Sequence, residues 1–268
     1  MSKARILRKE LVYSFAILLS AVIFTGCGEK DGVIILPGKV KLEMVRVEAG
    51  TFEMSANDGL NSSNEVAHSV TLTKDFYIGR TEVTQAQWRA VMGRNPSEFT
   101  RDSLPVLNVS WNDAMAFCQK LNNSGRAPSG WKFTLPTETQ WEYAARGGKN
   151  SKGCRYSGSN DIPSDVGWHS ANTGGAPNSV REKKANELGL YDMSGNVWEW
   201  CLDDWNDDSS KQEAEFTRGN DIGGSERVIR GGAWNARDTC CRTTFRASTD
   251  PKDKNTGIGF RLALVPAQ

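Results

Sequence analysis

The stretch from Gly189 to Trp200, GLYDMSGNVWEW, decides the fold of this chain. Gly195 permits a turn, and the residues after it alternate if the backbone is extended. Trp198 and Trp200 then lie on one face, where large aromatic side chains supply scaffold packing. Glu199 lies on the other face, where its carboxylate is able to bind a cation or a backbone edge.

Five further motifs stand in order around this stretch and extend over most of the chain. They are GRTEVT at Gly79–Thr84, PVLNVSW at Pro105–Trp111, LPTETQWEYAARG at Leu135–Gly147, RGGAW at Arg230–Trp234 and GFRL at Gly259–Leu262. Together the motifs resemble the formylglycine-generating enzyme, or sulfatase-modifying factor, domain family over roughly Met44 to Leu264. The resemblance implies an α+β, C-type-lectin-like fold with a small mixed or antiparallel sheet, a few helices and a high loop content.

Local signals predict three short helices among strands and loops. Each predicted helix follows a hydroxyl residue that can cap it: Thr84 before Gln85–Met92, Ser110 before a helix that passes Leu121, and Thr137 before the third. Apolar and β-branched residues predict strands within Met44–Met54 and Val70–Ile78. Gly, Asn, Ser and Asp dominate after Gly147, so long loops are expected there.

The composition excludes two classes of site. The 268 residues include 33 lysines and arginines against 32 aspartates and glutamates, so the chain lacks the basic surface that non-specific nucleic-acid binding requires. The two histidines, His68 and His169, are too few for a three-histidine metal centre. We expect a monomeric domain with no nucleic-acid partner.

The N-terminal region predicts export and lipid anchoring. Basic residues precede an apolar run, Leu11–Phe24, that is short for a membrane span and typical of a signal peptide. The following FTGC sequence resembles the bacterial lipobox, although Phe24 replaces the usual leucine. The prediction is a lipoprotein signal peptide over residues 1–26, a lipidated Cys27, a tether over residues 27–43 and one domain over residues 44–268. This places the protein in the bacterial cell envelope, at the outer membrane or cell surface, with plain secretion and an uncleaved anchor as alternatives.

The family resemblance implies a structural calcium ion in the Gly189–Trp200 stretch. Its ligands would be Asp192, Gly195, Val197 and Glu199, with aspartate in place of the family's more usual asparagine at the first position. Hard oxygen ligands on a glycine-containing turn suit calcium. The alternative is a carboxylate that caps its own loop without a metal.

The resemblance also implies where catalysis would occur. Enzymes of the family oxidise a substrate cysteine by using two of their own cysteines, which bind copper as thiolates. Counted from Gly232, the two family positions are Ala236 and Cys241 here, so one copper ligand is missing. Cys240 is a poor substitute, because adjacent residues on a strand point to opposite faces. We therefore expect no bound copper and no catalytic residue; Cys241 would be the residue concerned if the protein were an enzyme.

The remaining cysteines give no complete pairing. If Cys27 carries lipid, five cysteines remain, so at least one thiol is expected to stay free. Cys118 lies in an apolar helical stripe and is expected to be a small buried hydrophobic residue.

The segment from Trp234 to Gly257 mixes aromatic, charged, hydroxyl and small residues without a period. Such a composition suits surface recognition. Its position between RGGAW and GFR resembles the variable proteins of diversity-generating retroelements, several of which are lipoproteins that use this domain to display a ligand site. The candidate ligand-binding residues are Trp234, Asn235, Arg237, Asp238, Thr239, Thr244, Phe245 and Ser248. Cys241, Arg242, Phe260 and Arg261 are expected to hold the scaffold.

These observations favour a membrane-anchored, surface-displayed lipoprotein that binds a protein or another surface ligand through a catalytically degenerate domain. Three alternatives stay open. The protein could be a copper-dependent oxidase that makes formylglycine from sulfatase cysteines, or a structural subunit of an envelope complex. The segment could also be a divergent loop in a degenerate homologue.

Overall fold

The computed structural model describes residues 22–23, 31–56, 59–60, 62–161, 163–211 and 224–267. Cys27 and the predicted signal peptide, apart from Val22–Ile23, lie outside these ranges. Within them, no helix combines the length and the apolar character that a membrane crossing requires.

The largest sheet has six strands, and every neighbouring pair is antiparallel. Its order is β1 (Val22–Ile23), β2 (Asp31–Ile35), β3 (Lys41–Val47), β6 (Phe76–Gly79), β12 (Ala263–Pro266) and β7 (Trp131–Thr134). The last strand in sequence, β12, therefore lies inside this sheet and joins β6 to β7.

Two smaller sheets complete the strands. A four-stranded sheet has the order β10 (Arg246–Thr249), β9 (Arg227–Arg230), β8 (Trp198–Asp204) and β11 (Ile258–Gly259), with β11 parallel to β8. A hairpin pairs β4 (Gly50–Met54) with β5 (His68–Leu72). The predicted strands over Met44–Met54 and Val70–Ile78 are each divided between two elements, and the predicted mixed α+β architecture is confirmed.

The tether predicted over residues 27–43 is wrong from Asp31 onward. β2 pairs with β3 along its whole length, and its buried residues alternate with more exposed ones. Ile34, Leu36 and Leu42 are buried in the core. These residues pack inside the domain because their alternation gives the two strands an apolar face.

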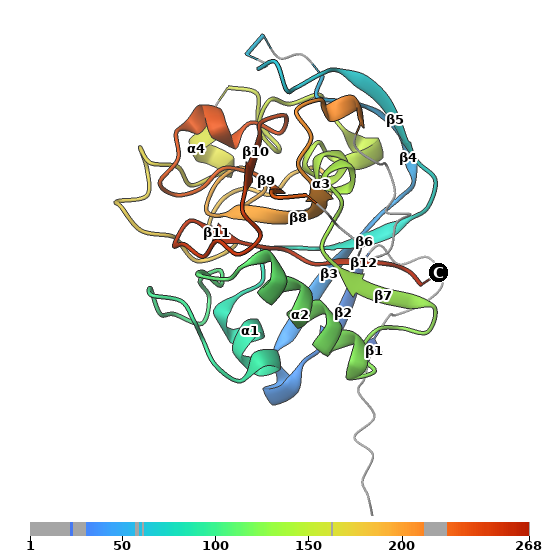
Figure 1. Ribbon diagram of the computed structural model, residues 1–268, viewed down its shortest axis with the longest axis vertical. Coiled ribbons are helices and arrows are strands. Elements are labelled where there is room, and N and C mark those ends of the chain that lie inside the picture. The colour runs from blue at the N-terminus through green and yellow to red at the C-terminus, as the bar shows by residue number, and fades with distance from the viewer. Residues whose placement is uncertain are drawn as a thin grey trace, which may run out of the picture.

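The three predicted helices form at the predicted places. α1 (Gln85–Met92), α2 (Trp111–Asn123) and α3 (Glu138–Ala145) begin after Thr84, Ser110 and Thr137, and each has a complete capping box. A short fourth helix, α4 (Pro163–Val166), was not predicted. Figure 1 shows α1 and α2 on one side of β6 and β12, with α3 and β8–β10 on the other.

Aromatic side chains join these layers. The Trp88 ring stacks on Phe117 at 5.4 Å between centroids, and both rings meet Phe260 edge-on. The Trp111 indole donates a 2.8 Å hydrogen bond to the Cys201 carbonyl, and the Trp200 indole donates one of 3.0 Å to that of Val109. The two indole groups thus tie α2 and the loop before it to β8, which helps a loop-rich chain keep one shape.

Candidate functional site

Two glycines connect β9 to segment 234–257, at positions where a side chain would be strained. Gly231 and Gly232 have φ values of +95° and +77°, in the left-handed region. A Cβ atom on Gly232 would lie 2.6 Å from the Cys241 sulfur. This close approach holds Cys241 beneath the start of the segment, at the end of a 3-10 turn over Asp238–Cys241.

Four predicted ligand-binding residues project to solvent. We call Asn235, Arg237, Asp238 and Thr239 the exposed run, since all four are exposed. Their backbone is nevertheless ordered by a 2.9 Å hydrogen bond from the Ala236 N–H to Ala233 and one of 3.0 Å from the Cys240 N–H to Arg237. The exposed run therefore presents polar side chains from a fixed loop.

Three other candidates, Trp234, Phe245 and Ser248, are half-buried. The Trp234 indole donates a 2.8 Å hydrogen bond to the Thr256 carbonyl, so this residue also ties the two ends of the segment together. The Phe245 ring lies 6.0 Å from that of Trp198. Trp234 thus adjoins the exposed run, whereas the Ser248 hydroxyl of β10 donates a 2.9 Å hydrogen bond to Glu226.

Thr244 was wrongly expected to face a ligand. It is only 2% exposed, and its hydroxyl accepts a 2.7 Å hydrogen bond from Arg242. Arg242 in turn holds Glu65 with bonds of 3.0 and 2.9 Å. The predicted scaffold residues Cys241, Arg242, Phe260 and Arg261 are all buried, as expected.

The two positions that correspond to the copper ligands of the family's enzymes hold one sulfur, and this sulfur is buried. Ala236 is half-buried, Cys241 is buried, and the Cys241 thiol lies 3.7 Å from the Arg237 carbonyl. Burial raises the pKa of this thiol, and Cys240 and Asp238 raise it further. Cu(I) binds thiolates, so a neutral buried thiol without a second sulfur at position 236 is poorly suited to copper.

This burial predicts the order of thiol modification. Iodoacetamide should alkylate the half-buried Cys154 and Cys240 before the buried Cys118, Cys201 and Cys241 in the native protein. Peptide mass spectrometry over time measures the order, and the same reaction in denaturant provides the control. Rapid native alkylation of Cys241 would contradict the buried placement.

The carboxylate predicted to complete the calcium site is already engaged. Arg261 donates 2.6 Å hydrogen bonds to both oxygens of Glu199, and the Trp141 indole donates one of 2.7 Å. Among the residues that the structure describes, no group of three histidine, cysteine or acidic side chains is placed to hold a metal ion.

Two neighbouring oxygens are nevertheless unsatisfied. Glu82 Oε2 and Asp192 Oδ1 are buried and have no hydrogen-bond partner within the described ranges. Burial raises the pKa of both carboxyls, with Asp192 reaching about 6, and nearby carboxylates add to the effect. Three acids thus face one buried guanidinium, Arg261.

A buried charge network under the segment was missed from the sequence. Arg230 contacts Glu138 at 3.1 Å and Glu142 at 2.6 Å, and Arg246 contacts Glu138 at 2.6 Å, with all four side chains fully buried. Arg230 also donates to the carbonyls of Thr243 and Thr244. The network therefore fixes the segment's backbone, but its partners lie so far apart in sequence that no local motif reveals them.

Asp203 beside this network predicts a pH effect. Its carboxyl accepts a 2.6 Å hydrogen bond from the Glu138 N–H, and burial, together with the Glu138 charge, raises its pKa to about 7. A raised pKa in the folded state means that the stabilising contribution is present at low pH and is lost as pH rises from about 4 to 7.

We expect the native protein to lose about 1 kcal/mol more unfolding free energy than Asp203→Asn between pH 5 and pH 8, since Asp203 is only half-buried as a residue. Urea unfolding of both proteins at the two pH values measures this difference. Equal pH dependence in the two proteins would show that Asp203 does not titrate in this range.

Comparison with known proteins identifies the family of this chain and supports the fold described above. Residues 37–265 match the sulfatase-modifying factor enzyme 1-like domain family. Treponema denticola variable protein 1 superposes with a TM-score of 0.77 at 30% identity, covering 88% of this chain and 99% of that one. The structure of PvdO from Pseudomonas aeruginosa gives a TM-score of 0.70 at 26% identity, covering 83% and 94%.

Two sequence relatives carry different names. Chaperone protein LppX of Paenibacillus barcinonensis is 33% identical over 266 residues, covering 82% of this chain and 88% of that protein. The formylglycine-generating enzyme of Thermomonospora curvata is 34% identical over 206 residues, covering 69% and 63%. The match over residues 37–265 shows that this chain belongs to the sulfatase-modifying factor enzyme 1-like domain family.

Proposed function

We propose that this protein is a lipid-anchored binding protein of the bacterial cell envelope. Its domain displays the exposed run, with Trp234, Phe245 and Ser248 as further candidate contacts, to a protein or another surface ligand. Cys27 carries the anchor, at the outer membrane or the cell surface.

The observation that carries the proposal concerns the two positions that correspond to the copper-binding cysteines of the family's enzymes. Ala236 stands where the family's enzymes have a cysteine, Cys241 is buried, and the surrounding loop exposes four polar side chains on a fixed backbone. Such a surface supplies adaptable hydrogen bonds without a reactive group.

The likeness to a protein named a variable protein supports a diversified ligand face. The relative named a chaperone supports a second candidate, in which the same face binds one fixed partner protein. The two candidates differ in what the genome should contain: only a diversified face requires a second, template copy of the DNA that encodes the exposed run.

Genome inspection tests diversification. We expect a near-copy of the DNA for Trp234–Phe260 beside a reverse-transcriptase gene, differing mainly at adenines. Absence of such a copy removes the retroelement candidate and leaves the fixed partner.

A substitution scan tests whether the face can vary at all. Changes at Asn235, Arg237, Asp238 and Thr239 should alter unfolding free energy by less than about 0.5 kcal/mol, because these side chains are exposed. Arg242→Ala is the matched buried control and should be strongly destabilising, since it removes the guanidinium that pairs with the buried Glu65 carboxylate. Losses of similar size at the exposed positions would argue against a variable face.

The anchor has its own test. The native protein should enter the detergent phase of a Triton X-114 separation, and Cys27→Ser should remain in the aqueous phase. If Cys27→Ser enters the detergent phase as the native protein does, the result supports an uncleaved anchor. If the native protein stays in the aqueous phase, the result supports plain secretion.

Calcium binding at Asp192 forms a further part of the proposal. Added calcium should raise the unfolding temperature at pH 7.5 relative to chelator, because a ligand that binds the folded state stabilises it. Asp192→Ala should abolish this shift in unfolding temperature. Asp102→Ala removes an exposed carboxylate that pairs with Arg89 of α1, and this variant should retain the shift. Equal unfolding temperatures of the native protein with calcium and with chelator would count against the site.

A further inference from the structure

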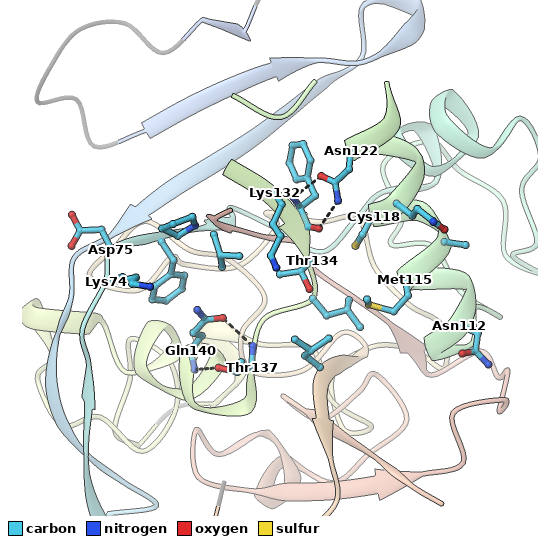
Figure 2. A pocket seen from close by; sticks show the side chains of 18 residues that line it. Lys74, Asp75, Asn112, Met115, Cys118, Asn122, Lys132, Thr134, Thr137 and Gln140 are labelled. Carbon is cyan, nitrogen blue, oxygen red and sulfur yellow. Dashed lines mark hydrogen bonds between the residues drawn. The ribbon is translucent and has the colours of Figure 1, made fainter. Parts of the chain in front are cut away.

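A cavity lies outside segment 234–257, and no residue of that segment lines it. The cavity measures about 430 Å³ and is bounded by α2, β7, β12 and the turn before β6 (Figure 2). This volume lies within the usual range of small-molecule sites, about 300–1,000 Å³.

The floor of the cavity is the apolar core itself. Phe76, Cys118, Phe133, Leu135 and Leu202 line it and are buried, and the half-buried Met115 adds a flexible thioether wall. A hydrocarbon chain or ring placed here would leave water for an apolar surface that is already packed from behind.

The rim is cationic. Lys74 and Lys132 both line the cavity, and Asp75 is the one acidic residue among its lining side chains. The Asp75 carboxylate is engaged by Arg46 and by a 2.7 Å hydrogen bond from the Ala49 N–H. Figure 2 shows this carboxylate pointing away from the other labelled residues, with Lys132 extending along the wall toward Thr134. A ligand in the cavity therefore meets positive charge.

The walls are held without a ligand. The Asn122 side chain of α2 donates a 2.9 Å hydrogen bond to the Phe133 carbonyl and accepts one of 2.8 Å from its N–H, which locks α2 to β7. On the opposite wall, Gln140 accepts a 3.0 Å bond from the Thr137 N–H in the α3 capping box. Because these walls are already ordered, a ligand that binds here would cause little further loss of conformational entropy in the protein.

We propose that this cavity binds a small amphiphilic anion of the fatty-acid type. The chain would pack against Met115 and Val265, which are half-buried lining residues, and the carboxylate would meet Lys132, with Lys74 adding positive charge. The cavity shares no residue with the exposed run, so this proposal can be tested independently of the proposed function.

Isothermal titration calorimetry of the purified protein with sodium octanoate tests the proposal, with octanol and acetate as comparisons. Octanoate should bind saturably, octanol about tenfold more weakly for lack of the charge, and acetate not measurably. Lys132→Gln should weaken octanoate about tenfold without changing octanol. Lys120→Gln is the control, because Lys120 is exposed on α2 beside the cavity but does not line it, and this variant should bind octanoate normally.

Filling the mouth tests the location. Ala116 and Gln119 are exposed lining residues, so Ala116→Trp and Gln119→Trp should block octanoate while the protein stays folded by circular dichroism. Octanoate binding that survives both substitutions, or that is absent in the native protein, would overturn the site. Equal binding of octanol and octanoate, with no effect of Lys132→Gln, would overturn the anionic class. Arg237→Ala, in the exposed run, should leave octanoate binding unchanged.

Discussion

Arg261→Met should lower the free energy of unfolding by about 3–5 kcal/mol at pH 8, because it removes one member of a buried ion pair. The guanidinium is fully buried and donates to both oxygens of Glu199 and to the carbonyls of Gly79 and Tyr191. Glu82 and Asp192 lie close enough to raise its pKa by their charge. Methionine would leave the Glu199 carboxylate buried without its guanidinium partner.

Urea unfolding measures this loss, and two comparisons identify its cause. Arg89→Met breaks an exposed pair with Asp102 and should cost less than about 1 kcal/mol. The cost of Arg261→Met should shrink at pH 5, where the carboxyls can take up protons and lose their charge. A cost that is the same at both pH values would assign the effect to packing rather than to charge.

Ala236→Cys should increase the affinity for Cu(I) by orders of magnitude over the native protein. A soft Cu(I) ion favours two thiolates in near-linear arrangement, and Cys241 is the one sulfur retained from the family pair. The second sulfur would also favour ionisation of Cys241, whose pKa burial now raises. The half-buried backbone at Ala236 is already fixed through Ala233 and Ser170.

Competition with a chromogenic Cu(I) chelator measures this affinity. Asn235→Cys adds a thiol one position away on the exposed run and should bind far more weakly. The native protein, incubated with copper and a peptide bearing a sulfatase-type cysteine, should form no aldehyde. Aldehyde formation that Cys241→Ala abolishes would restore the oxidase as the function.

Local features were predictable from the sequence, and long-range ones were not. Thr84, Ser110 and Thr137 each cap a helix through a partner three residues away, so a short window contains the whole signal. The alternation in Asp31–Ile35 was equally local, but glycine and proline nearby favoured a tether.

Thr239 and Thr244 show where such prediction ends. Both are small polar residues of one segment, yet the first is exposed and the second is buried beside Arg242. That burial depends on the pairing of Arg242 with Glu65, which is 177 positions away in the chain. The lysine-rimmed cavity also brings together α2, β7 and β12, so its chemistry exists only after the chain has folded.

The position of β12 bears on when this protein can fold. Its four residues, Ala263–Pro266, pair with β6 on one side and with β7 on the other. During synthesis from the N-terminus, β6 and β7 are made long before the strand that joins them. The six-stranded sheet thus stays divided until β12 has been made and can pair with both strands. Pairing of β12 with β6 and β7 is therefore expected to be a late step when the domain folds during synthesis.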